Sequence, residues 1–251
     1  MPDYAQHIYS QFNDPVAQQE LQEMSPSGVD WVARTRQTLD LLVPQLGSAA
    51  REVATRIPER LNSMVELIKD IRRGELLVGT HADQRIAEWY SSLSNNACLA
   101  SRIIAQIESQ QVSAEIQRYL LASTSLGAHT HPNGNSIYPD LIVSGHDYSM
   151  LPQQNRRTPV EGPCLRGTRP SNVPDGCEIK TNRGNRVHVD AHGAHSGLHF
   201  GVTWDRTDGI VAITGVWAAY VRIADHRESG RNVAVTTVKH SFGHELFVSL
   251  L

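Results

Sequence analysis

Residues 197–221 read GLHFGVTWDRTDGIVAITGVWAAYV, and this stretch carries the clearest structural signal in the chain. Residues 205–209, DRTDG, have the composition of a hairpin turn. The residues that follow, 210–223, predict a second strand, either long or broken. In the first half, alternation predicts a strand with one apolar face, formed by Leu198, Phe200, Val202 and Trp204.

Two shorter apolar runs upstream carry charged residues. Residues 177–182 read CEIKTN and predict a strand in which Glu178 and Lys180 project from the same face. Residues 138–143 read YPDLIV and predict another strand, with Asp140 near its beginning. If these two strands pair, two carboxylates and one ammonium group meet at one edge of the sheet.

Such a group of side chains suits the hydrolysis of a phosphodiester bond. Carboxylates supply the hard oxygen ligands that Mg²⁺ prefers. A bound Mg²⁺ neutralises charge that develops on the phosphate and lowers the pKa of a bound water. A lysine beside it can orient that water. We therefore expect Asp140, Glu178 and Lys180 to be the catalytic residues.

These residues resemble a known family. Pro139 and Asp140, a spacer, and then Glu178, Ile179 and Lys180 match the pattern of the PD-(D/E)XK nuclease superfamily, and within it of type II restriction endonucleases. The resemblance implies an α/β/α core with a mixed sheet and Mg²⁺-dependent cleavage of double-stranded DNA at a specific, palindromic sequence. It assigns the metal to Asp140, Glu178 and the backbone carbonyl of Ile179.

The resemblance covers residues 138–225. The spacer between its two halves is longer than usual and requires an insertion, which the loop at 144–174 can provide. Residues 197–221 look like the continuation of the sheet that is common in these nucleases. Residues 232–238 and 244–250 are further strand candidates.

The chain before this pattern reads as helical from residue 15 to 125. Proline is poorly tolerated inside a helix, so we expect Pro44 to end the first long helix. The apolar stripe of that helix includes Val29, Val32, Leu39 and Leu42.

Later helices follow the same pattern. A second helix is expected to begin at Pro58 and to end at Gly74, which suits the preference for proline near the start and glycine past the end. A third helix is expected over 83–111. A fourth is expected over 112–123, with Ser113 as its cap.

We predict two regions within one compact unit. The helical region, 1–125, would act as scaffold or dimer interface, and the catalytic core would occupy 126–251. Because one chain offers a single set of catalytic residues, cutting both strands of a duplex requires two chains. A homodimer on a palindromic site meets that need, since the symmetry of the protein then mirrors that of the DNA.

Basic residues outnumber acidic ones between residues 156 and 186, although the whole chain has a net charge of −3. A basic stretch beside a carboxylate pair suits a phosphate backbone. Asparagine and arginine also bond base edges in the major groove. The alternative is a solvated loop with scattered arginines. The residues predicted to contact DNA are Arg156, Arg157, Asn182, Arg183, Asn185, Arg186 and His188.

A cluster of histidines raises an alternative function. Imidazoles bind zinc or iron, so the alternative is a metalloenzyme that acts on a small molecule. Glycines and a serine within the cluster argue against the helix that its spacing would suit. A non-specific or repair nuclease of the same fold, and a binding protein without catalysis, also remain open. The histidines concerned are His129, His131, His188, His192, His195 and His199.

The composition is that of an ordinary globular protein, with 40% hydrophobic and 20% charged residues in a chain of 251. The first residues do not form a secretory signal, and no run approaches the length of about 18 apolar residues needed to span a membrane. We therefore expect a cytoplasmic protein without membrane contact. Cys98, Cys164 and Cys177 form neither a disulfide framework nor a zinc pattern. Neither a P-loop nor a dinucleotide fingerprint is present, so no nucleotide cofactor is expected.

Overall fold

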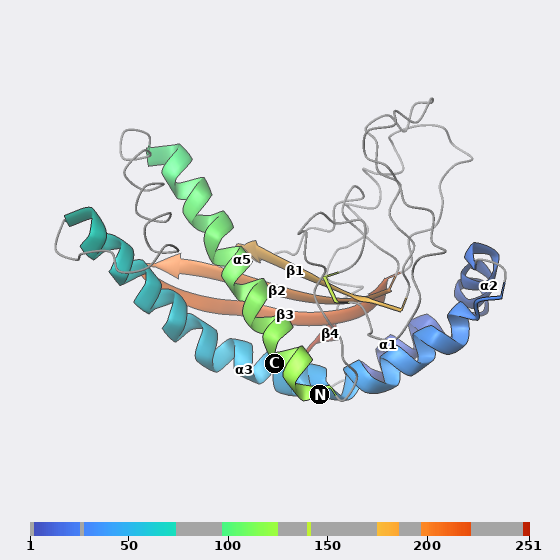
Figure 1. The fold of residues 1–251 in the computed structure, drawn as a ribbon. Helices are drawn as coiled ribbons and strands as arrows, with labels where there is room; N and C mark the ends of the chain where they lie inside the picture. Colours follow the sequence, from blue (N-terminus) through green and yellow to red (C-terminus); the bar gives the residue numbers. More distant parts are fainter. Residues whose placement is uncertain are drawn as a thin grey trace, which may run out of the picture.

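The structure is a computed structural model (Figure 1). It describes residues 3–25, 28–73, 97–124, 140–141, 175–185, 197–221 and 248–251. The helices in these ranges are α1 (Tyr4–Phe12), α2 (Pro15–Met24), α3 (Trp31–Arg73) and α5 (Ala97–Ser123). The strands are β1 (Cys177–Arg183), β2 (Gly197–Thr207), β3 (Ile210–Val221) and β4 (Val248–Ser249).

The longest element, α3, runs through two prolines. The predictions that Pro44 ends one helix and that Pro58 begins another are wrong, because both lie inside α3. A proline inside a helix removes one backbone hydrogen bond and costs about 3 kcal/mol. The apolar stripe of α3 continues past both prolines, and Leu42, Leu46 and Leu61 are all buried. Burial of this stripe offsets the local cost, and Figure 1 shows α3 as one bowed helix.

The ends of the long helices agree only in part with the sequence. Helix α3 is described as far as Arg73, and the predicted end of this helix at Gly74 lies outside the described residues. Helix α5 is continuous, so Ser113 lies inside it and the prediction of a separate helix capped by Ser113 is wrong. A serine inside a helix costs only about 0.5 kcal/mol relative to alanine. The buried stripe containing Ile116 and Leu120 outweighs that cost.

Two short helices precede α3, and the first begins earlier than the predicted start at residue 15. Each begins after an aspartate whose carboxylate caps it, and Asp3 and Asp14 both accept a backbone N–H hydrogen bond at 3.1 Å. Phe12 at the end of α1 packs edge-on against Tyr220 of β3, with ring centroids 5.4 Å apart. Helix α1 is thereby joined to the sheet.

The strands form one sheet in the order β1-β2-β3-β4. Strand β1 pairs with β2 in parallel, and the other neighbours are antiparallel, so the sheet is mixed. The predicted hairpin between β2 and β3 is confirmed, with its turn at Asp208 and Gly209. Their φ values of 54° and 84° are those of a type I′ turn, whose twist matches that of the flanking strands.

A bulge keeps the apolar residues of β3 on one face of the sheet. The pairing of β2 with β3 shifts register between Thr203 and Trp204. Because side chains alternate along a strand, a shift of one residue exchanges the faces of everything beyond it. Val211 and Val216, on either side of the bulge, both join the buried core as a result. The stretch that follows the hairpin turn is thus one long strand with a single irregularity.

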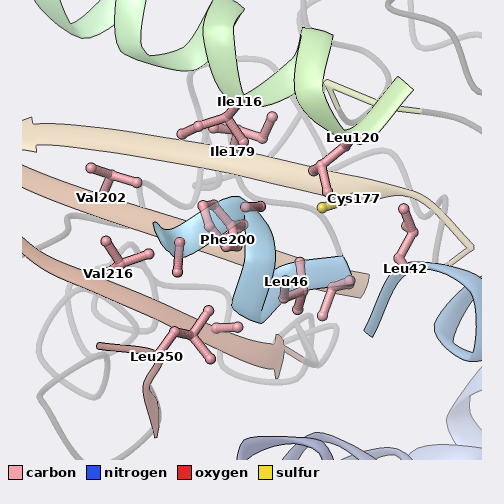
Figure 2. Close-up of a cluster of buried hydrophobic side chains, with 14 of the residues drawn as sticks. Leu42, Leu46, Ile116, Leu120, Cys177, Ile179, Phe200, Val202, Val216 and Leu250 are labelled. Atoms are coloured by element: carbon pink, nitrogen blue, oxygen red, sulfur yellow. The ribbon is translucent and has the colours of Figure 1, made fainter. Parts of the chain in front are cut away.

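The helices and the sheet share one hydrophobic core (Figure 2). Four residues of β2 were predicted to share a face, and all four are buried in this core. In Figure 2 the side chains from α3 and α5 meet those from β1, β2 and β3. The labelled residues are Leu42, Leu46, Ile116, Leu120, Cys177, Ile179, Phe200, Val202, Val216 and Leu250.

The described residues therefore form a mixed α/β structure in which α1, α3 and α5 pack on one face of a four-stranded mixed sheet. The second helical layer of an α/β/α core is not tested by these residues, and the strand predicted at 232–238 lies outside them. Strand β4 falls within the strand predicted at 244–250. Among the described helices, none is both long and apolar enough to cross a membrane.

Candidate metal-binding and catalytic site

The segment that carries Asp140 pairs with β1. Leu141 and Cys177 form an antiparallel bridge in which each backbone N–H donates to the other residue's carbonyl at 2.9 Å. In an antiparallel pair the neighbours of bridged residues also face each other, which places Asp140 opposite Glu178. The pairing on which the predicted site depends is therefore present, on the side of β1 away from β2.

The Asp140 side chain extends this pairing. Its Oδ2 accepts a hydrogen bond from the backbone N–H of Ile179 at 2.7 Å. The preceding residue in the sequence is Pro139, which has no N–H with which to continue the ladder. The N–H and C=O of one strand residue point to the same edge, so the Ile179 carbonyl faces the Asp140 side of β1. Two of the predicted metal ligands thus lie at one edge of the sheet.

Glu178 and Lys180 project from the face of β1 opposite to Ile179, as their spacing predicts. The Lys180 Nζ donates to Oε1 of Glu178, so the two side chains form an ion pair. The Glu178 side chain is 7% exposed and that of Lys180 is 20% exposed. The carboxylate therefore lies inside the protein, and the lysine retains some access to solvent.

Burial raises the pKa of Glu178, because a charged carboxylate loses its hydration. Lys180 and a backbone hydrogen bond from Asp140 act in the opposite direction and lower it. The contact with the Asp140 backbone also joins the two carboxylate-bearing residues directly. All three predicted catalytic residues therefore belong to one network of contacts.

The same burial affects the neighbouring thiol. Cys177 is fully buried, and its pKa is raised well above the ordinary value, first by desolvation and then by the nearby Asp140 and Glu178 carboxylates. A thiol held protonated is a poor nucleophile and a poor metal ligand. Cys177 is therefore a core residue.

The donor set fits Mg²⁺. Two carboxylates and a backbone carbonyl are hard oxygen ligands, and Mg²⁺ usually retains several waters besides one or two carboxylates. Within the described ranges, His, Cys, Asp and Glu form no group of three or more that is arranged to hold an ion. The residues that would hold Mg²⁺ are Asp140, Glu178 and, through its carbonyl, Ile179.

Asp175 is a third carboxylate close to β1, and it has a different role. It is fully buried in the turn before the strand, and its Oδ2 lies 3.0 Å from both Nε and Nη2 of Arg34 in α3. The Arg34 guanidinium in turn lies over the Trp31 ring, 4.7 Å from its centroid. This ion pair ties the beginning of β1 to α3 and so helps to position the strand that carries Glu178.

His199 lies beside Glu178, a position that the sequence did not suggest. The two residues are register partners in neighbouring parallel strands, so their side chains project from the same face. His199 is fully buried, and its Nδ1 lies 3.1 Å from the Gly197 carbonyl oxygen. Because a carbonyl only accepts, Nδ1 carries a proton in this contact. The other histidines of the cluster, His129, His131, His188, His192 and His195, lie outside the described residues.

The signal for the position of His199 was in the alternation of β2. Residues of that strand with even numbers from Leu198 to Trp204 are apolar and face the helices. His199 lies between two of them and must face the other way. The residue of β1 that lies beside His199 follows only from the register of β1 with β2. That register depends on contacts between residues far apart in the sequence.

The predicted DNA contacts divide between the two faces of β1. Asn182 is half-buried on the face of the Glu178–Lys180 ion pair, and Asn185 is exposed beyond the strand. Arg183 is on the opposite face, where its Nε donates to Asp205 at 3.1 Å and its guanidinium lies 6.0 Å from the centroid of the Trp204 ring. The remaining predicted contacts, Arg156, Arg157, Arg186 and His188, lie outside the described residues.

Comparisons of the chain with family models, curated proteins and solved structures found no match. Function is therefore inferred from the contacts of the described residues. The contacts that bear on it join Asp140, Ile179, Glu178 and Lys180 around β1.

Proposed function

We propose that the protein is a Mg²⁺-dependent nuclease that hydrolyses phosphodiester bonds in double-stranded DNA. The observation that carries the proposal is the bridge between Leu141 and Cys177, because it brings Asp140 opposite Glu178 across a long intervening sequence. If the motifs around Asp140 and Glu178 occurred by chance, we would not expect them to lie on neighbouring paired segments. This pairing, together with the mixed sheet, supports the PD-(D/E)XK core as the finer description of the fold.

Each residue of the site has a distinct task in this proposal. Asp140, Glu178 and the Ile179 carbonyl hold Mg²⁺, which supplies Lewis acidity and an activated water when bound. Lys180 orients the attacking water and stabilises the negative charge that develops on the phosphate. The buried position of Glu178 lowers the local dielectric constant and strengthens these interactions.

We further propose a specific, palindromic DNA site, as in type II restriction endonucleases. Asn182 and Asn185 carry amides of the kind that bond adenine in the major groove, and they flank the end of β1 next to the site. A duplex has two strands and the chain one such site, so the active form would be a two-fold symmetric homodimer. Restriction is the biological role that fits this specificity.

Incubation of the full chain with plasmid and phage DNA in the presence of Mg²⁺ tests the proposal. Discrete fragments are the expected result, and removal of Mg²⁺ with a chelator should stop cleavage. A smear would instead indicate a non-specific nuclease. No cleavage of any DNA under these conditions would contradict the nuclease proposal.

Variants connect the activity to the site. Asp140→Asn should abolish cleavage and leave DNA binding largely intact, because phosphate and base contacts come from other residues. Asp3→Asn is the matched control, since asparagine replaces aspartate as a helix cap almost without loss. Cleavage by Asp140→Asn at the rate of Asp3→Asn would show that the site lies elsewhere.

A histidine-ligated metalloenzyme that acts on a small molecule is the alternative. The buried His199 beside Glu178 is the observation in its favour. Elemental analysis separates the two functions, because Mg²⁺ washes off during purification, whereas zinc or iron would remain in stoichiometric amount.

Sedimentation of the free protein tests the homodimer. The chain mass is 27.8 kDa, and a species of twice that mass is expected at micromolar concentration. A monomer that dimerises only on DNA would keep the symmetry argument and exclude a preformed interface. A monomer on DNA that nicks each strand in turn would refute the dimer.

A further inference from the structure

Lys180 is bound to one of the carboxylates that the proposed metal site uses. Its Nζ donates to Oε1 of Glu178, and no more than a fifth of either side chain is exposed. Burial raises the pKa of Glu178, and the charge of Lys180 is the largest influence that lowers it. In the protein without metal, Lys180 is therefore the counter-ion of a buried carboxylate.

An ammonium group and a divalent cation repel each other when both lie against this carboxylate. Like charges a few ångströms apart repel strongly where the dielectric constant is low. Glu178 is buried on the sheet, with 7% of its side chain exposed. Lys180 has an alternative position, because its side chain is 20% exposed and its four-carbon stem is flexible.

We infer that a divalent cation binds this site by displacing Lys180 from Glu178, so that an exchange of counter-ions controls binding. The inference rests on the proposed function for its two carboxylate ligands, Asp140 and Glu178. The released ammonium group adds its charge to the side of the site that a phosphate approaches. Lys180 therefore weakens the binding of the cation alone. When DNA is also present, the released ammonium group attracts the phosphate, so the cation and DNA each strengthen the binding of the other.

Binding of Mn²⁺ to the full chain without DNA tests this exchange, with free Mn²⁺ measured by electron paramagnetic resonance. Mn²⁺ accepts the same oxygen ligands as Mg²⁺. Lys180→Gln removes the charge and retains a side-chain N–H for Glu178. It should bind Mn²⁺ about tenfold more tightly than the wild type, because the competing like charge is gone. Lys180→Arg, the matched control that keeps the charge, should bind no more tightly than the wild type.

Equal or weaker binding by Lys180→Gln would overturn the exchange. Asp140→Asn distinguishes that failure from a failure of the proposed function. If Asp140→Asn weakens Mn²⁺ binding and Lys180→Gln brings no gain, the metal site stands and the exchange is wrong. If Asp140→Asn binds Mn²⁺ as the wild type does, the metal site itself is wrong and both proposals fall. Circular dichroism of each variant confirms that it is folded.

Discussion

The two faces of the same strands hold different kinds of buried residue. One face carries apolar side chains such as Ile179 and Phe200, which pack against the helices. The other carries Glu178, His199 and Thr203, which are polar and almost as deeply buried. Burial alone therefore does not separate core from candidate site in this protein. The alternation along each strand does, because it assigns neighbouring residues to opposite faces.

This difference predicts that substitutions on the two faces have different effects on stability and on metal binding. On the helix face, lost volume should destabilise the fold as a whole. On the Glu178 face, lost charge should impair metal binding and leave the fold intact or more stable. Substitutions of Phe200 and Glu178 test the two sides of that contrast, and substitutions of Arg34 and Arg183 compare a buried ion pair with an exposed one.

Phe200→Ala should have the largest effect on stability. Phe200 is fully buried in the core between the sheet and α3, and its truncation is expected to lower the free energy of unfolding by about 3–5 kcal/mol. Urea unfolding followed by tryptophan fluorescence measures the loss. Phe200→Leu is the control and should lose much less, because most of the apolar volume is kept. A loss below about 1 kcal/mol would be closer to the effect of a surface substitution and would contradict the assigned core.

Arg34→Met should have the next largest effect. It leaves Asp175 buried without its ion-pair partner, and removal of one partner of a buried pair costs about 3 kcal/mol or more. Arg34→Met combined with Asp175→Leu should recover most of that stability, since an apolar pair avoids the buried charge. The same urea experiment applies. If the double variant loses as much unfolding free energy as the two single variants together, the two side chains do not act as a pair.

Glu178→Gln should raise stability at neutral and alkaline pH. Burial raises the pKa of Glu178 above its ordinary value of 4.5, so the folded chain holds this proton more tightly than the unfolded chain does. The contribution of Glu178 to stability is therefore complete below about pH 4.5 and is lost as the pH rises through the folded pKa. Glutamine does not ionise and avoids this loss.

The expected gain for Glu178→Gln is about 2–4 °C in melting temperature at pH near 8 without divalent cations, which corresponds to about 1 kcal/mol. The difference from the wild type should shrink as the pH falls below about 4.5, where both side chains are neutral. Thermal scans across this range provide the measurement. A variant less stable than the wild type at every pH would show that the ion pair with Lys180 outweighs the burial of the carboxylate.

Arg183→Ala should have the smallest effect on the fold. Both Arg183 and its partner Asp205 are exposed, and ion pairs of this kind contribute little. The melting temperature should not change measurably. If Arg183 contacts a phosphate, the slope of log affinity for DNA against log salt concentration should fall by about one. An unchanged slope would remove Arg183 from the DNA interface.

The sequence predicts the strands better than the helices, and the reason is physical. Alternation and the turn composition of residues 205–209 are local properties, and the strands and the hairpin that they predict are present in the structure. Pro44 and Pro58 are also local signals, yet they mislead, because the packing of α3 against the sheet overrides their local cost. Packing of this kind depends on residues far away in the sequence.

The sequence predicted which residues form the candidate site, but it did not predict the residues that surround them. Spacing alone puts Glu178 and Lys180 on one face of a strand. Three features depend on long-range contacts that no local pattern encodes: the pairing of Leu141 with Cys177, the ion pair of Arg34 with Asp175, and the register that sets His199 beside Glu178. These contacts make the environment of the site, including the burial that raises the pKa of Glu178.

The central claim is that Asp140 and Glu178 hold one divalent cation at the edge of β1. A crystal structure of the full chain with Mn²⁺, located by its anomalous scattering, tests this claim most directly. The account predicts one strong peak at about 2.1–2.2 Å from a carboxylate oxygen of each residue and from the Ile179 carbonyl, with Lys180 moved away from Glu178. A peak among the histidines at 188–199, with Asp140 and Glu178 bare of metal, would contradict it.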